Sequence, residues 1–229
     1  NIEVSNIDNK THISLTAKDD LPAKDIIVSG DPSSAAFLVA AALLVKDSKI
    51  LIKNVLINPN RIGFYQILLK MGAKIEFLNK RNVSGEQVAD IKASYSELEG
   101  IDIDAKFASA TIDEYPILAI LAAKARGKTR MNGLAELKVK ESNRFTAIID
   151  NLRNCGVVVE NGDDWMEVSY AEKIIAENEI KTHHDHRIAM SFIILGLIAN
   201  SKIIIDDINM INTSFPEFFD KLSEVGAGA

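Results

Sequence analysis

The sequence has few of the features that mark secreted, membrane-spanning or nucleic-acid-binding proteins. Its one cysteine, Cys155, excludes a disulfide framework and fits a reducing compartment. The net charge is −6 with no basic block, which argues against a protein held to nucleic acid through phosphate contacts. The longest uncharged apolar segments, Pro32–Val45 and Ile188–Ser201, have 14 residues each and are too short to cross a bilayer.

The composition is that of an ordinary globular protein. Hydrophobic residues make up 47% of the 229 residues and charged residues 25%, so the chain can bury a substantial core. Asn1–Lys10 is polar and of mixed charge, unlike a signal peptide. We therefore expect a cytoplasmic α/β protein without a nucleic-acid or membrane partner. A small anionic substrate stays possible, because an acidic protein can carry local positive charge.

The chain repeats one unit three times. Three β-type segments contain lysines at positions 49, 128 and 202, with spacings of 79 and 74 residues. Each segment follows a long apolar run and precedes an amphipathic run that ends at a glycine, the residue favoured where a helix ends with a positive φ. The β-type segments are Ser48–Val55, Gly127–Leu134 and Ser201–Ile208, and the glycines are Gly72, Gly156 and Gly226.

Each unit is predicted to run helix, strand, helix and then a pair of strands. The first helix is apolar on nearly all sides, as in Ser33–Val45, and such a helix is buried all round. Three buried parallel helices with sheets outside them would make an inside-out α/β fold, with a conventional doubly wound sheet as the competing prediction.

The third unit lacks its strand pair after Gly226. Either another segment supplies those strands or the chain is a piece of something longer, and residues 1–28 look like the tail of a preceding unit.

An aspartate introduces each buried helix. Asp31, Asp113 and Asp185 lie 82 and 72 residues apart, which is again the period of the repeat. Pseudo-symmetry would bring the three helix N-termini together, and helix N-termini favour anions. The alternative is that these aspartates are only N-caps.

Two polar segments are the candidates for chemistry. In the segment Lys138–Arg144, Lys140 and Arg144 have the spacing of one helical face. Glu141 lies among these cations, where a carboxylate suits acid–base catalysis beside an anionic substrate. The alternative is that this segment is only a solvated, charged helix start. Lys181–Arg187 places polar groups against an apolar helix, which is costly unless they are used or paired. A metal site at His183, His184, Asp185 and His186 is an alternative, but the three histidines do not share one helical face, so we expect no metal.

Several motifs occur in an order that resembles one known family. They are Gly30–Ala36, Asn58–Arg61, Gly85–Asp90, Asp113–Pro116, Lys138–Arg144, Asp185–Met190 and Thr213–Phe218. Together they resemble the 5-enolpyruvylshikimate-3-phosphate synthase (3-phosphoshikimate 1-carboxyvinyltransferase) family over essentially all 229 residues. The resemblance implies an inside-out α/β lobe of the enolpyruvyl transferase type, with about three βαβαββ units around buried parallel helices.

The resemblance also implies that the chain has about half of the family's length. Residues 1–28 would be the tail of the N-terminal lobe, and residues 29–229 the C-terminal lobe with an incomplete third repeat. The missing N-terminal lobe would then be a partner, and the isolated chain would be inactive. The other reading is a non-catalytic remnant or an anion-binding module that keeps the fold.

The implied reaction transfers the enolpyruvyl group of phosphoenolpyruvate to shikimate 3-phosphate, in aromatic amino acid biosynthesis, without metal or organic cofactor. By resemblance, Asp113 contacts the shikimate hydroxyls as proton acceptor, and Glu141 handles protonation at the enolpyruvyl methylene. Arg144 and Arg187 would hold phosphoenolpyruvate, for which glyphosate competes, and Lys140 would help to bind shikimate 3-phosphate. Thr213 stands where some members carry a lysine, so that contact is not implied here.

Overall fold

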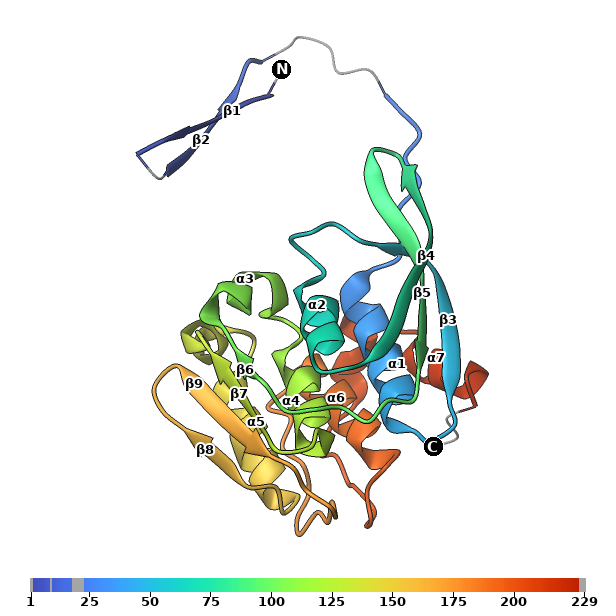
Figure 1. The fold of residues 1–229 in the computed structure, drawn as a ribbon, viewed down its shortest axis with the longest axis vertical. Coiled ribbons are helices and arrows are strands. Elements are labelled where there is room, and N and C mark those ends of the chain that lie inside the picture. Colours follow the sequence, from blue (N-terminus) through green and yellow to red (C-terminus); the bar gives the residue numbers. More distant parts are fainter. Residues whose placement is uncertain (1, 9, 18–22, 227–229) are drawn as a thin grey trace.

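The computed structural model describes residues 2–8, 10–17 and 23–226 of the chain. Near its start, β1 (Ile2–Ile7) and β2 (Lys10–Leu15) form a two-stranded antiparallel sheet of their own (Figure 1). Because opposite residues share a face, the pairs Ile2–Leu15 and Val4–Ile13 give this hairpin one apolar face, and all four side chains are exposed. The hairpin therefore presents an apolar surface that its own two strands do not cover.

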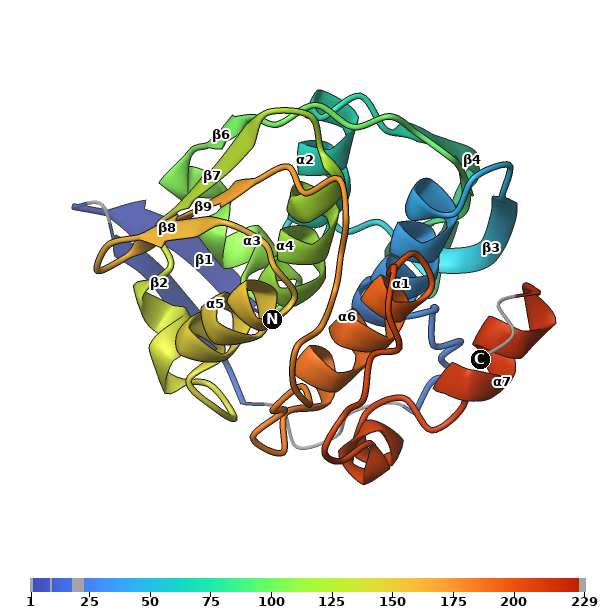
Figure 2. The ribbon, with the colours of Figure 1, turned by 90° about the horizontal axis from the view of Figure 1, so that it is seen from below.

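Three apolar helices form the centre of the remaining chain. They are α1 (Pro32–Leu44), α4 (Tyr115–Lys124) and α6 (His186–Gly196), and they pack against one another (Figure 2). The first two are buried on nearly all sides, as the lack of a polar face predicted. Their N-termini lie at one end of the lobe, because side chains from the three helix starts contact each other there. The predicted arrangement of buried parallel helices is confirmed.

Two separate sheets flank these helices in place of one central sheet, so the doubly wound alternative is wrong (Figure 2). One has the order β3-β5-β4, and its strands are β3 (Lys49–Leu56), β4 (Lys74–Val83) and β5 (Glu86–Ser94). The other has the order β6-β7-β9-β8, and its strands are β6 (Asp102–Ile103), β7 (Lys128–Asn132), β8 (Val159–Asn161) and β9 (Trp165–Ser169). Neighbouring strands are antiparallel except for β6 and β7, which run parallel.

Shorter helices connect these elements. The amphipathic ones are α2 (Gly63–Lys70), α5 (Arg144–Asn154) and α7 (Phe218–Glu224). Each is followed by a glycine with positive φ, at Gly72, Gly156 and Gly226, which confirms the predicted helix ends. The remaining short turns are η1 (Ala105–Phe107), α3 (Ala108–Thr111), η2 (Ala135–Val139) and η3 (Asn209–Thr213).

The third repeat departs from the prediction. Ser201–Ile208 was expected to be a strand, but it forms only a single parallel bridge, between Ile180 and Ile205. A strand exists only through its partner, and no strand pair follows α7 among the described residues. A groove of about 570 Å³ lies between this segment, α6 and α7, and Ile204 is 53% exposed. The third side of the helix bundle is thus covered by extended chain in place of a sheet.

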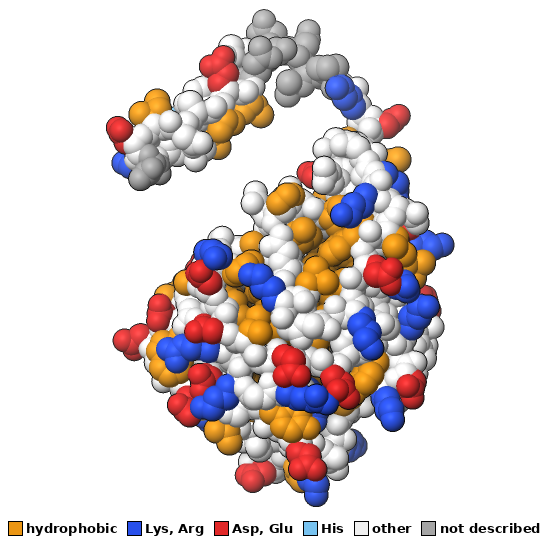
Figure 3. Space-filling model, viewed as in Figure 1, with side chains coloured by type: hydrophobic (Ala, Val, Ile, Leu, Met, Phe, Trp, Pro, Cys, Tyr) orange, Lys and Arg blue, Asp and Glu red, His pale blue; other side chains and the backbone are white. Residues whose placement is uncertain are grey.

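Charges of both signs are mixed over the lobe. Figure 3 shows Lys and Arg side chains interspersed with Asp and Glu over one face. The net charge of −6 is therefore not gathered into one acidic surface on that face. On that face, recognition of an anion would need a local arrangement of cations.

Candidate active site

The starts of the three central helices meet at one end of the lobe. Asp31 caps α1, where its Oδ2 accepts from the Ser34 amide at 2.8 Å. Asp185 caps α6, where its Oδ1 accepts from the Arg187 amide at 2.9 Å. Asp113 makes no such capping bond at α4, whose N-cap residue is Glu114. Two of the three aspartates are therefore caps, and the carboxylate of Asp113 is left for other contacts.

Arg144 is the centre of the cluster. Its guanidinium is fully buried, which is costly for a cation unless carboxylates compensate it. Nε lies 2.8 Å from Asp185 Oδ2, Nη1 lies 3.0 Å from Asp113 Oδ1, and Nη2 contacts Glu141. Nη2 nevertheless makes no hydrogen bond of good geometry within the described part of the chain. Nη2 is therefore the nitrogen of this guanidinium that is held least well, by its ion pair with Glu141.

Arg187 lies on the other side of Asp113. Its Nη1 donates to the Asp113 carbonyl oxygen at 3.1 Å, and Nη2 is 3.8 Å from Asp113 Oδ2. The Asp113 side chain is 43% exposed although two arginines hold it. A carboxylate fixed in this way and open to solvent can accept a hydrogen bond or a proton from a bound molecule.

Glu114 is a member of the cluster that the sequence did not single out. Its buried Oε1 accepts a hydrogen bond from the Ser33 hydroxyl, across the starts of α1 and α4, and lies 3.8 Å from Arg187 Nη1. Burial raises the pKa of Glu114 to about 7, although the Ser33 hydrogen bond and Arg187 oppose that rise. The only sequence signal was its place beside Asp113 at a helix start.

Ser33 extends the cluster to Arg61. Arg61 Nη2 donates to Ser33 Oγ at 3.1 Å and to Asp31 Oδ1 at 3.0 Å. Arg61 and Asp31 are both about half exposed, so this pair lies at the rim. The cluster thus runs from the first repeat through Glu114 to the arginines of the second and third.

Lys140 is placed differently from the prediction. It has extended backbone between η2 and α5, which starts only at Arg144, so Lys140 and Arg144 do not share a helical face. The Lys140 ammonium group pairs with Glu136 at 3.1 Å. The predicted helical relation is wrong because Asn143 caps α5 through a bond from the Thr146 amide and so starts the helix later.

The histidines and Thr213 contribute little to this cluster. His183 and His184 are exposed and adopt positive φ in the turn before Asp185, and Thr213 donates to Met210 O at 2.7 Å. His186 is half buried, and burial together with Arg187 lowers its pKa, so its imidazole is neutral at pH 7. No group of three or more possible metal ligands occurs in the part of the chain that the structure describes.

No helix among the described residues is both long and apolar enough to span a bilayer. Burial raises the pKa of the Cys155 thiol to about 11, so this buried cysteine is no nucleophile.

These features define a class of protein. The lobe is an inside-out α/β unit that gathers helix N-termini, two arginines and several carboxylates at one end, which suits binding of a charged small molecule with acid–base groups beside it. Residues 1–222 match the family described as EPSP synthase (3-phosphoshikimate 1-carboxyvinyltransferase). The chain belongs to this family, as the motifs predicted.

Named relatives agree. The 3-phosphoshikimate 1-carboxyvinyltransferase of Chelativorans sp. (strain BNC1) is 47% identical over 218 residues, which is 94% of this chain and 49% of that protein. That of Bartonella tribocorum is 49% identical over 209 residues, 90% of this chain and 47% of that protein. The chain therefore spans about half the length of the curated relatives it matches.

Solved structures show the same fold. EPSP synthase from Acinetobacter baumannii superposes with a TM-score of 0.90 at 36% identity, over 97% of this chain and 51% of that one. The enolpyruvyl transferase NikO from Streptomyces tendae superposes with a TM-score of 0.61 at 15% identity, over 86% of this chain and 43% of that one. This likeness supports the fold alone. The expected enolpyruvyl transferase type of α/β lobe is confirmed.

Proposed function

We propose that this chain supplies one lobe of a 3-phosphoshikimate 1-carboxyvinyltransferase. The reaction transfers the enolpyruvyl group of phosphoenolpyruvate to a hydroxyl of shikimate 3-phosphate, by addition and then loss of phosphate. The observation that carries the proposal is the half-exposed Asp113 carboxylate, held between the buried Arg144 and Arg187. Both substrates carry several negative charges, so a site with fixed cations is required.

Each member of the cluster has a role in this proposal. Asp113 accepts the proton of the attacking hydroxyl, because it is fixed by two arginines and open to solvent. Glu141 is 50% exposed at the rim and delivers a proton to the enolpyruvyl methylene. Arg144 and Arg187 hold phosphoenolpyruvate through guanidinium groups that match carboxylate and phosphate geometry. Lys140, near the start of α5, binds the phosphate of shikimate 3-phosphate once it releases Glu136.

The proposal includes a second lobe. Residues 29–229 form the C-terminal lobe, and residues 1–28 are the tail of the N-terminal lobe. The exposed apolar face of the β1–β2 hairpin supports this division, because such a face would pack on chain outside these residues. Closure of two lobes excludes water from the substrates. The 229-residue chain alone is then inactive, and the assay needs the lobe that the relatives have in addition.

The test uses the protein with both lobes. Phosphate release is measured with phosphoenolpyruvate and shikimate 3-phosphate, for the wild type and for Glu141→Ala. We expect the variant to lower turnover by at least about 100-fold, the usual worth of a proton-transfer group. Glu172→Ala, at an exposed carboxylate in the loop after β9, is the control. Near-normal turnover by Glu141→Ala refutes its role, and a wild type that binds phosphate without turnover indicates an anion-binding module.

A further inference from the structure

Glu114 is the point at which all three central helices meet. It stands at the start of α4, its Oε1 accepts from Ser33 in the first turn of α1, and it lies 3.8 Å from Arg187 in the first turn of α6. The side chain is 8% exposed. The charged groups that act on it are Arg187, Asp113 and Arg61, and Tyr65 is the further titratable group whose pKa it raises.

The cluster has too few cations for the carboxylates it holds. Arg144 and Arg187 face four acidic side chains, which are Asp113, Glu114, Glu141 and Asp185. The rim pair of Arg61 and Asp31 adds no net charge. An incoming anion with several charges meets this excess of negative charge, so its binding is favoured if one carboxylate becomes neutral.

The contacts single out one of the four carboxylates. Asp185 bonds to Arg144 at 2.8 Å, accepts from Ser142 at 3.0 Å and caps α6, so its charge is well compensated. Asp113 and Glu141 are about half exposed, and water solvates them. Glu114 is buried, has one hydroxyl donor, and depends on Arg187 for its nearest countercharge. An anion that draws on Arg187 removes that compensation.

We propose that Glu114 is the group that takes up a proton when an anion occupies Arg187. The inference rests on the proposed function in that Arg187 holds the anionic substrate. Water or buffer supplies the proton, which binds to a Glu114 carboxylate oxygen, and no other bond forms or breaks. The Ser33 hydroxyl can turn to accept from the protonated acid, since it is both donor and acceptor.

The expected pH dependence follows from linkage. In the protein without a bound anion, the pKa of Glu114 is about 7, and burial is the main cause. The bound anion raises this pKa further. Affinity for the anion is then highest below pH 7. Above pH 7 it falls by up to about tenfold per pH unit, until the pKa of the bound state is passed. The bound complex holds more protons than the free protein throughout that interval.

Sulfate is the probe, because it keeps one charge state across this range and its binding needs no catalysis. Binding to the 229-residue chain is measured by calorimetry between pH 6.5 and 8.5, in two buffers of different ionisation enthalpy, which gives the number of protons taken up. The wild type is compared with Glu114→Gln, which keeps the shape and removes the titration. Arg187→Ala identifies the site, and circular dichroism confirms that each variant is folded.

Two further variants sharpen the test. In Ser33→Ala, Glu114 loses a hydrogen bond that lowers its pKa, so the pH at which affinity falls moves upward. A residue with only a structural role would not shift that midpoint.

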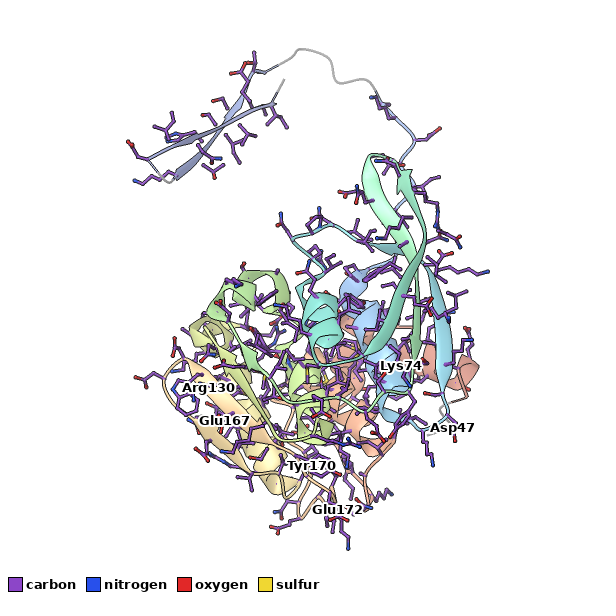
Figure 4. The ribbon with its side chains drawn as sticks, viewed as in Figure 1. Asp47, Lys74, Arg130, Glu167, Tyr170 and Glu172 are labelled. Atoms are coloured by element: carbon purple, nitrogen blue, oxygen red, sulfur yellow. The ribbon has the colours of Figure 1, made fainter. Side chains whose placement is uncertain are left out.

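Glu172→Gln removes the same charge at the far end of α4, where the Lys124 ammonium donates to the Glu172 carbonyl oxygen (Figure 4). The ten residues of α4 separate the two sites by about 15 Å. This control should behave as the wild type.

The inference is supported if the wild type takes up protons above pH 7 and Glu114→Gln takes up none and binds with flat pH dependence. It is overturned if the wild type takes up no proton, if Glu114→Gln keeps the uptake, or if sulfate binding is absent or unaffected by Arg187→Ala. These outcomes are separate from the turnover assay. Proton uptake without enolpyruvyl transfer by the two-lobed protein refutes the proposed function and leaves the role of Glu114 standing.

Discussion

Replacement of Asp185 by asparagine tests whether the buried Arg144 controls the energetics of the cluster. Asp185 is fully buried, and Asp185→Asn removes its charge while it keeps the size of the side chain and an N-cap of equal quality. The loss of one partner of a buried ion pair typically costs 3–5 kcal/mol. Arg144 keeps Asp113 and Glu141, so we expect the lower end, about 3 kcal/mol.

Asp31→Asn is the matched control, because Asp31 also caps a central helix and also pairs with an arginine. Its pair with Arg61 is about half exposed, so we expect a loss of at most about 1 kcal/mol. Urea unfolding, followed by circular dichroism, measures both variants. With a slope of about 2–3 kcal/mol per molar urea, Asp185→Asn should lower the midpoint by about 1 M and Asp31→Asn by a third of that or less. Equal losses would refute the view that Asp185 stabilises the fold by compensating Arg144.

Three more predictions follow from the packing and from the buried carboxyl. Cys155 should resist thiol reagents in the folded chain and react after unfolding, because it is buried and its pKa is about 11; rapid labelling without denaturant would contradict this. Gly100→Ala should lower the free energy of unfolding in urea by about 1–3 kcal/mol, because the new Cβ would lie 2.3 Å from the Lys128 carbonyl oxygen. Gly85→Ala meets no atom within 4 Å and should cost about 1 kcal/mol, because φ is positive at Gly85. The reverse order of the two losses would show that the contact with Lys128 yields easily. The pKa of Glu114 is about 7 in the folded chain and near 4.5 in the unfolded chain, so its contribution to stability falls by about 3 kcal/mol from pH 4.5 to pH 7. The urea midpoints of Glu114→Gln should lack this fall. Midpoints of the wild type and of Glu114→Gln that change in parallel with pH would refute the buried titration.

Local patterns predicted the elements that depend on nothing distant. The helices α1 and α4 were found because an all-apolar run of that length can only be buried, and the C-terminal glycines were found because φ is positive there. The capping bond that the alternative interpretation expected at each of the three aspartates occurs at Asp31 and Asp185 and is absent at Asp113. In each case the sequence signal lies within a few residues of the chain, even where the packing partners of α1 and α4 are distant.

The errors occurred where a distant partner decides the structure. Ser201–Ile208 has the composition of a strand, yet without a neighbouring strand its backbone finds only one bridge, at Ile205. Lys140 has helical spacing from Arg144, but the cap at Asn143 starts the helix after it. Glu114 was missed because its contact with Ser33 joins residues 81 positions apart, and no local signal reports such a pair.

In the proposed function, Arg144 offers a cation to an anion although the chain as a whole is acidic. A solvated lysine or arginine has to lose rotamer freedom before it holds a ligand. Arg144 has lost that freedom already, since Asp113 and Asp185 fix two of its nitrogens and Glu141 contacts the third. The carboxylates that offset the positive charge of the arginines are thus the groups that orient the arginine donors. Their excess negative charge is the cost of that rigidity, and Glu114, with a pKa of about 7, is the member of the cluster that can give up its charge near neutral pH.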